Sequence, residues 1–139
     1  SGLSYNNYFQ QKIRDRIGMN GVWIKTLNSN NTYFSNARSM ARFGLLLLNK
    51  GRWANTAILS DTAYFNSQIN TSQHFNLTYG YLTWLNGKAS SMVPGSQVVF
   101  PLALIPNAPA DMYAALGKDD QKIYVVPSQQ LVIIRLQQR

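Results

Sequence analysis

Three short apolar segments near the end of the chain constrain its fold more than any other feature. They are residues 112–116, 122–126 and 131–136, and each has the length and the side chains typical of a β-strand. Residues 117–121 and 127–130 connect them, and connections of this length suit hairpins between antiparallel neighbours. We therefore expect the chain to end in an antiparallel meander.

A strong helical pattern precedes these strands, in "SNARSMARFGLLLLNKG". Ser35 or Asn36 can cap the helix, and Gly51 supplies the residue that ends it. The spacing predicts one continuous buried stripe, made of Ala37, Met40, Ala41, Gly44, Leu47 and Leu48.

Two weaker helices complete the helical part. Residues 5–17 follow a candidate cap at Ser4 and stop at Gly18, with an apolar face of Tyr5, Tyr8, Phe9, Ile13 and Ile17. A short helix is expected to begin at Ser60, with buried positions at Ala63, Tyr64 and Ile69.

The remaining segments are predicted as loops or strands from their turn residues and alternation. Residues 20–33 are rich in Asn and read as a loop, whereas 77–87 alternate and are rich in aromatics, as in a strand. Residues 98–112 contain three prolines and read as an extended connection. Helices come first and an antiparallel sheet last, so the fold class is α+β, with the sheet packed against helices.

Charge and cysteine content exclude several classes of function. Only 13% of residues are charged, and the net charge of +8 arises because there are five Asp and no Glu. The 13 basic residues are scattered and belong to no recognisable module, so we expect no nucleic-acid partner. With no cysteine and one histidine, we expect no metal site and no cofactor. No apolar run approaches the ~20 residues of a membrane span.

Nucleophilic catalysis needs a serine beside a base, and this sequence does not supply the pair. Ser35 and Ser39 are each followed three residues later by arginine, which keeps its proton in proteins and cannot act as a base. We interpret both serines as helix-cap or solvated-face residues. His74 lies in a polar segment and is read as a surface histidine, and the Tyr-x-Asn matches at Tyr5 and Tyr64 are expected by chance.

The turn after the first of the three strands combines Gly117, Lys118, Asp119, Asp120 and Gln121. A lysine beside two carboxylates is usually a solvated ion-pair partner, and the carboxylates oppose the lowered pKa that a catalytic lysine needs. A glycine at the end of a strand lets a ligand approach the backbone closely, and a glutamine across the turn can hydrogen-bond that ligand.

The ordered set of segments resembles the C-terminal part of the serine beta-lactamase-like family, which includes class C beta-lactamases, penicillin-binding-protein-like hydrolases and esterases. "SGLSYNNYFQQKIRDRIGM" is similar to the family's Gly-x-Ser-x-x-x-Tyr helix and its Pro-Leu-Gly-Met turn. "FSNARSMARFG" resembles Ser-Thr-Ala-Arg-Asp-Met-Ala-Arg-Phe-Gly, and "YGYLTW" resembles the Tyr-Gly-Tyr-x-Trp strand. "LGKDDQKIYVVP" is similar to the final hairpin, in which many members read Gly-x-Gly-Gln before Ile-Tyr-Val-Val-Pro.

The resemblance implies a site along the strand that ends at Gly117. The family's Lys-Thr-Gly or His-Thr-Gly maps near Ala115, Leu116 and Gly117, and of the three only the glycine is retained. Ala115 cannot recognise a carboxylate as the family residue does. The strand backbone at Gly117 is implied to lie near the oxyanion site, which needs no particular side chain. Ala115, Leu116, Lys118 and Gln121 are implied to line the substrate.

The resemblance also implies that the reactive groups lie elsewhere. The Ser-x-x-Lys helix and the Tyr-x-Asn element would precede Ser1, and a closing helix would follow Arg139. We therefore expect residues 1–139 to form a single partial domain, the C-terminal fragment of a larger serine hydrolase domain. Its partner would be the missing N-terminal part of the same fold or another chain. The intact parent would act on small amides or esters as a beta-lactamase, esterase or amidase, and this segment alone would be inactive.

An alternative interpretation is a non-catalytic module that binds cell-wall glycan or peptide. Tyr79, Tyr81 and Trp84 would then form a stacking face, although core packing accounts for aromatic residues in a strand as well. The absence of cysteine fits an exported bacterial protein, periplasmic or secreted, without establishing that compartment.

Overall fold

The computed structural model describes residues 2–26 and 31–137, and the segment 27–30 of the predicted loop lies outside these residues. The helices are α1 (Tyr5–Phe9), the π-helix η1 (Gln10–Arg14), the 3-10 helix η2 (Asp15–Ile17), α2 (Ala37–Leu48), α3 (Thr62–Gln68), and the 3-10 turns η3 (Lys118–Asp120) and η4 (Pro127–Gln129). The strands are β1 (Val22–Lys25), β2 (Asn31–Phe34), β3 (Arg52–Trp53), β4 (Thr56–Ala57), β5 (Trp84–Leu85), β6 (Tyr113–Leu116), β7 (Lys122–Val126) and β8 (Leu131–Arg135).

The predicted meander is confirmed as the central sheet. Its strands are antiparallel neighbours in the order β5-β6-β7-β8, and β6, β7 and β8 lie within a residue of the predicted segments. Register is fixed by alternation, because Ile123, Val125, Val132 and Ile134 all belong to the face that packs on the main core. The fold class is therefore α+β, as the sequence predicted.

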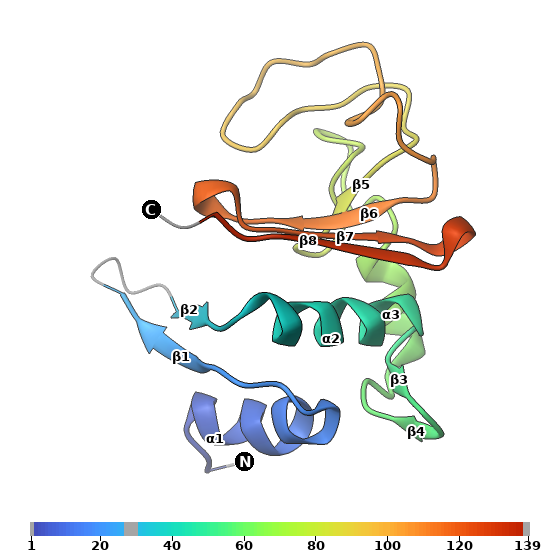
Figure 1. The fold of residues 1–139 in the computed structure, drawn as a ribbon. Coiled ribbons are helices and arrows are strands. Elements are labelled where there is room, and N and C mark those ends of the chain that lie inside the picture. Colours follow the sequence, from blue (N-terminus) through green and yellow to red (C-terminus); the bar gives the residue numbers. More distant parts are fainter. Residues whose placement is uncertain (1, 27–30, 138–139) are drawn as a thin grey trace.

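Helix α2 lies across this apolar face of the sheet, as Figure 1 shows. A Cβ on Gly44 would come within 2.5 Å of Val132 Cγ1 and 3.2 Å of Ile123 Cγ2, so the missing side chain permits the close approach of helix to sheet. The N-cap is Asn36, whose side chain accepts a hydrogen bond from the Ser39 amide. Figure 1 also shows the long segment between β5 and β6 looping out on the opposite side of the sheet.

The predicted stripe on α2 is incomplete, because the helix is covered on two sides. Leu47 packs toward the sheet, whereas Leu46 is fully buried in a second cluster with Ile17 and Met19. Leu46 was absent from the predicted stripe, and Ala37, which was included, is exposed. A helix between two layers buries a wider arc than one stripe.

The first helix is present but is not uniformly α-helical. It passes from α1 into η1 and η2 and ends at Gly18, which adopts the left-handed conformation with φ 69°. The π turn changes the residue spacing and rotates the apolar face. Ile17 is consequently buried, but Tyr5 and Tyr8 are exposed, contrary to the predicted face.

The predicted loop at 20–33 contains a hairpin instead. β1 and β2 pair antiparallel, with Trp23 opposite Tyr33. The two rings lie 5.1 Å apart, and the Phe9 ring makes edge contacts with both. Cross-strand aromatic packing therefore outweighs the abundance of Asn in this segment.

Two further predictions need correction. Helix α3 begins at Thr62 with Asp61 as its cap, and its buried residue is Phe65 rather than Ala63 or Tyr64. In the segment predicted as one strand over 77–87, only β5 joins the sheet. The chain turns at Leu82, whose φ is 51°, so that Tyr79 bridges back to Trp84 instead of continuing a ladder.

Candidate functional site

The end of β6 carries the residues that the sequence singled out. Ala115 is exposed, Leu116 is half-buried, and the chain then turns at Gly117 into η3. Lys118 is exposed on this turn and Gln121 is half-buried at its end. All five predicted residues therefore lie together at one end of the sheet.

The amide of Gly117 is already used within the turn. It donates to the carbonyl oxygen of Gln121 at 2.8 Å, which closes the hairpin. The Gln121 side chain is likewise committed, because its Nε2 donates to the carbonyl oxygens of Asp119 at 3.0 Å and Gln137 at 2.9 Å. Neither the Gly117 N–H nor the Gln121 amide group points an unused donor at a ligand.

Leu116, in contrast, presents its backbone at an open strand edge. Backbone groups of successive residues face opposite edges of a strand, so the N–H and C=O of Leu116 face away from β7, toward the edge on which β5 lies. β5 pairs only with Tyr113 and Ala114 and does not reach Leu116. No strand among the described residues pairs with Leu116 on this edge. Its amide and carbonyl are thus available to an extended ligand.

The turn beside this edge is held by an ion-pair cluster. The Asp120 carboxylate pairs with Lys122 and Arg135 rather than with Lys118. The hydrogen bond from Lys122, together with the charge of Arg135, lowers the pKa of Asp120, and Asp120 raises the pKa of Lys122. Asp119 and Asp120 both have positive φ, 58° and 63°, a conformation that is uncommon for residues other than glycine.

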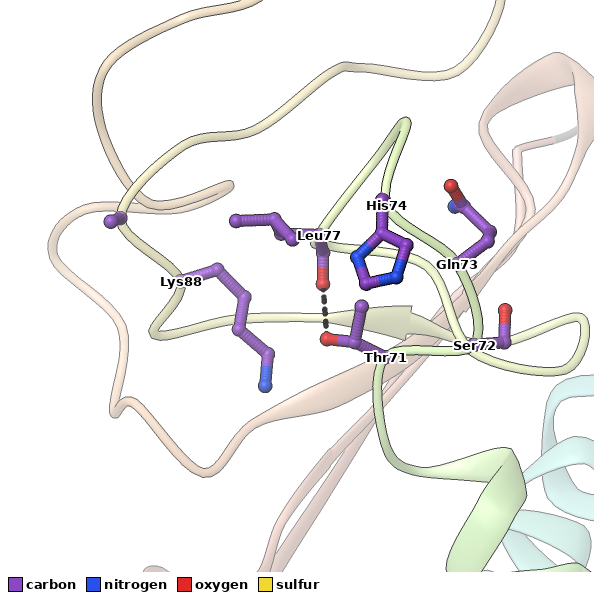
Figure 2. A pocket seen from close by; sticks show the side chains of 7 residues that line it. Thr71, Ser72, Gln73, His74, Leu77 and Lys88 are labelled. Atoms are coloured by element: carbon purple, nitrogen blue, oxygen red, sulfur yellow. Dashed lines mark hydrogen bonds between the residues drawn. The ribbon is translucent and has the colours of Figure 1, made fainter.

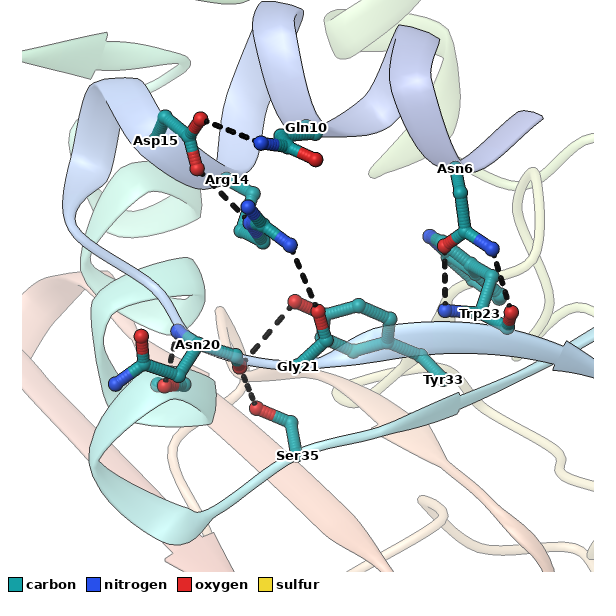
Figure 3. Close-up of polar contacts among 10 residues, drawn as sticks. Asn6, Gln10, Arg14, Asp15, Asn20, Gly21, Trp23, Tyr33 and Ser35 are labelled. Atoms are coloured by element: carbon teal, nitrogen blue, oxygen red, sulfur yellow. Dashed lines mark hydrogen bonds and ion pairs between the residues drawn. The ribbon is translucent and has the colours of Figure 1, made fainter. Parts of the chain in front are cut away.

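The two serines followed by arginine are structural. Ser39 is buried and accepts a hydrogen bond from the Asn20 amide at 2.9 Å, so it is not on a solvated face as predicted. Ser35 donates to the Asn20 carbonyl oxygen, which also accepts from the Tyr33 hydroxyl (Figure 3). These bonds attach the start of α2 to the segment that leads into β1.

A second set of contacts in Figure 3 ties the first helix to β1. The Asn6 side chain donates to the Trp23 carbonyl oxygen at 2.7 Å and accepts from its amide at 2.8 Å. Arg14 donates to the Gly21 carbonyl oxygen at 3.1 Å and pairs with Asp15, whose pKa it lowers. This polar network is explained by packing and needs no ligand.

In the part of the chain that the structure describes, cavities also occur away from Leu116. An apolar one of about 380 Å³ lies between η1, α2 and α3, lined by Ile13, Phe43, Leu47, Leu59, Ser60, Asp61, Tyr64, Phe65 and Gln68. Another, of about 450 Å³, is lined in part by His74, which is exposed, as the sequence predicted. Among the described residues, no three His, Asp or Glu side chains gather as metal ligands, and none of the helices is long and apolar enough to span a membrane.

Comparisons with known proteins support the fold. The structure matches a solved chain described as "Putative 6-aminohexanoate-dimer hydrolase from Bacillus anthracis", with a TM-score of 0.63 and 20% sequence identity. That protein belongs to the beta-lactamase/transpeptidase-like family. The fold is that of part of a beta-lactamase-like hydrolase. The match covers 91% of this chain but only 31% of the solved one, so the chain spans about a third of that neighbour's length.

No family model and no curated protein matches this sequence. The likeness to the solved hydrolase is therefore a likeness of fold. Sequence reasoning located the end of β6 but missed that the open backbone belongs to Leu116. That edge follows only from the pairing of β5 with β6, which extends no further along β6 than Ala114.

Proposed function

We propose that this chain is the sheet-bearing part of a beta-lactamase-like serine hydrolase, and that the edge of β6 at Leu116 lines the acyl-transfer site. The observation that carries the proposal is the unpaired edge of β6, at the place where the family motif maps onto Ala115, Leu116 and Gly117. An amide or ester substrate lying along this edge would receive a hydrogen bond from the Leu116 amide. The same amide, or that of Lys118, would stabilise negative charge that develops on the substrate carbonyl oxygen.

The nucleophile and the base would come from the remainder of the fold. This chain has no Ser-x-x-Lys pair, and the solved neighbour is about three times as long as the matched region. A complementary part, either the N-terminal part of the same fold or another chain, would supply the serine and the lysine. It would also cover the sheet face that α2 leaves open.

Covalent labelling tests whether the nucleophile lies outside this chain. The protein is incubated with a fluorescent penicillin or fluorophosphonate, and its intact mass is measured. We expect no adduct on residues 1–139, and an adduct on the serine of the complementary segment once the two are produced together. An adduct on this chain in isolation would overturn the proposal.

A pair of variants in the reassembled enzyme tests the role of the Leu116 amide. Leu116→Pro removes the N–H, and proline is tolerated where the N–H faces away from the ladder. We expect kcat/KM to fall about 100-fold or more, the range measured for loss of one oxyanion donor. Leu116→Ala keeps the amide and should change kcat/KM by only a few-fold. Equal losses in both variants would contradict a role for the backbone.

A binding module remains the second candidate, because one aromatic pair is exposed. The rings of Tyr64 and Tyr81 lie 5.6 Å apart, and 55% and 45% of these residues are exposed. The ring centroids of Tyr79 and Trp84 lie 4.8 Å apart, and both residues are half-buried. Of the three residues predicted to form a stacking face, only Tyr81 is exposed, and it pairs with Tyr64. Muropeptide binding by the isolated chain, without any covalent adduct and lost in Tyr81→Ala, would favour this candidate.

A further inference from the structure

The cavity lined by His74 and Lys88 lies beyond the end of β5 that is farther from Leu116. Leu85 pairs with Tyr113, and the Asn86 amide donates to the Met112 carbonyl oxygen, so the chain runs away from Leu116 as it approaches Lys88. The cavity has a volume of about 450 Å³, within the range of small-molecule sites. Its lining residues are Thr71, Ser72, Gln73, His74, Leu77, Lys88 and Ala89 (Figure 2).

The uncharged polar groups of this cavity are already paired. The Thr71 hydroxyl donates to the Leu77 carbonyl oxygen at 2.7 Å, and the Ser72 hydroxyl donates to the Tyr79 carbonyl oxygen at 3.1 Å. The Gln73 side chain donates to the Asn76 carbonyl oxygen at 2.8 Å and accepts from the Asn76 amide at 2.9 Å. These bonds fix the wall and give the two hydroxyl groups and the Gln73 side chain protein partners.

Lys88 and His74 differ from these groups. Both line the cavity, and Figure 2 shows their side chains on either side of the Thr71–Leu77 hydrogen bond. Lys88 is half-buried, no carboxylate lines the cavity, and the ion pairs of the described residues involve Asp15 and Asp120 instead. Lys88 therefore has no carboxylate partner among the described residues, and an anionic oxygen in the cavity would supply one.

We propose that this pocket binds a small organic carboxylate. Lys88 would pair with the carboxylate, His74 would donate a second hydrogen bond from its ring, and Leu77 and Ala89 would contact the apolar body of the ligand. A carboxylate fits better than a phosphate, because a phosphate site needs more donors than one ammonium and one imidazole supply. This inference is independent of the proposed hydrolase function.

The test is a titration of the ¹⁵N-labelled protein followed by amide chemical shifts. Hexanoate is the probe, and hexanamide has the same chain without the charge. We expect hexanoate to shift the amides of residues 71–77 and 88–89, with hexanamide at least tenfold weaker. Lys88→Met should weaken hexanoate binding about tenfold or more, the effect of losing a charge-assisted hydrogen bond. The matched control is Lys25→Met, in an exposed lysine on β1, and it should bind as the unchanged protein does.

Three results would overturn the proposal. Equal binding of hexanoate and hexanamide would show an apolar pocket that does not use Lys88. Inorganic phosphate that shifts the same amides with the affinity of hexanoate would show a general anion site. Unchanged hexanoate binding by Lys88→Met would show that Lys88 does not hold the carboxylate. Lys88→Gln, which keeps a polar end, serves as the second variant if the methionine disturbs the dispersion of the spectrum.

Discussion

Asp120 combines two roles that its neighbours in the sequence do not reveal. Its backbone adopts the left-handed conformation, which glycine favours. In the Gly-x-Gly-Gln pattern that the turn resembles, a glycine stands at this position, directly before the glutamine. Aspartate tolerates this conformation better than most residues. Its carboxylate then pairs with Lys122 on β7 and Arg135 on β8, so that one side chain joins the turn to two strands.

Replacement of Asp120 by Asn should remove the carboxylate charge while keeping the backbone conformation, and the loss of stability should depend on pH. The pKa of Asp120 is lowered on folding, so its contribution is complete above about pH 5 and disappears as pH falls through and below the unfolded value of about 3.9. The pKa of Lys122 is raised on folding, so the pair also weakens above about pH 10.4. Urea unfolding from pH 3 to pH 11 measures this. A difference that stays constant across the whole range would contradict it.

Tyr113 makes a buried hydrogen bond that joins the sheet to helix α2. Its hydroxyl donates to the Leu47 carbonyl oxygen at 2.9 Å, and burial raises its pKa above the ordinary value. Tyr113→Phe leaves that carbonyl without this donor and should lower the free energy of unfolding by about 1–2 kcal/mol. Tyr64→Phe, at an exposed position, is the control and should change it by less than about 0.5 kcal/mol. Equal effects in urea unfolding would show that the buried hydrogen bond contributes nothing.

At the scale of elements, the contact of α2 with the sheet depends on one missing side chain. Gly44→Ala adds a methyl group that overlaps Val132, and overpacking of this kind costs about 1–3 kcal/mol, against a gain of up to about 1 kcal/mol in helix propensity. We expect a net loss of stability in urea unfolding. The double variant with Val132→Ala should recover part of the loss because the space is restored. A Gly44→Ala protein as stable as the original would show that α2 can shift freely.

The long segment between β5 and β6 is anchored by Asn86. This buried side chain places Nδ2 within 3.0–3.1 Å of the carbonyl oxygens of Ile105, Ala108 and Pro109, and its Oδ1 accepts from the Ile105 amide at 2.9 Å. Asn86→Ala removes the donor to the Ala108 carbonyl oxygen and the acceptor of the Ile105 amide, whereas the Ile105 and Pro109 carbonyl oxygens keep the Ala108 and Met112 amides as donors. An unsatisfied buried group of this kind costs about 1–3 kcal/mol. We expect faster hydrogen exchange at Ile105 and unchanged exchange at Tyr124 in β7. Equal acceleration at both amides would mean that the sheet, not the segment, is disturbed.

At the scale of the whole molecule, the two faces of the sheet are covered unequally. One face packs on α2, whereas the other exposes 38% of Leu131 and 46% of Ile133 on β8, which pairs on one side only among the described residues. An apolar edge strand favours association with other chains. The complementary part of the proposed hydrolase would cover this surface.

Ile133→Lys should therefore reduce self-association of the isolated chain without changing its melting temperature by more than a few degrees. A charge on an exposed edge strand blocks strand addition, and Ile133 contributes little to the core. Sedimentation velocity measures the association. Val132→Lys, which places a charge on the opposite face of the same strand, should unfold the protein. If Ile133→Lys associates as the original protein does, the association uses a surface other than this face of β8.

The sequence alone determined the elements whose evidence is local. The three C-terminal strands, helix α2 and the stop at Gly18 follow from alternation, periodicity and turn chemistry within short segments, and the structure contains them. The ordered motifs also indicated a beta-lactamase-like fold before any coordinates. Tertiary structure decided what depends on distant residues. The aromatic cluster around Trp23 made a hairpin of a predicted loop, packing on two sides buried Leu46, and the early end of β5 left the Leu116 backbone open. These outcomes arise from contacts between segments far apart in the chain, and no local pattern contains them.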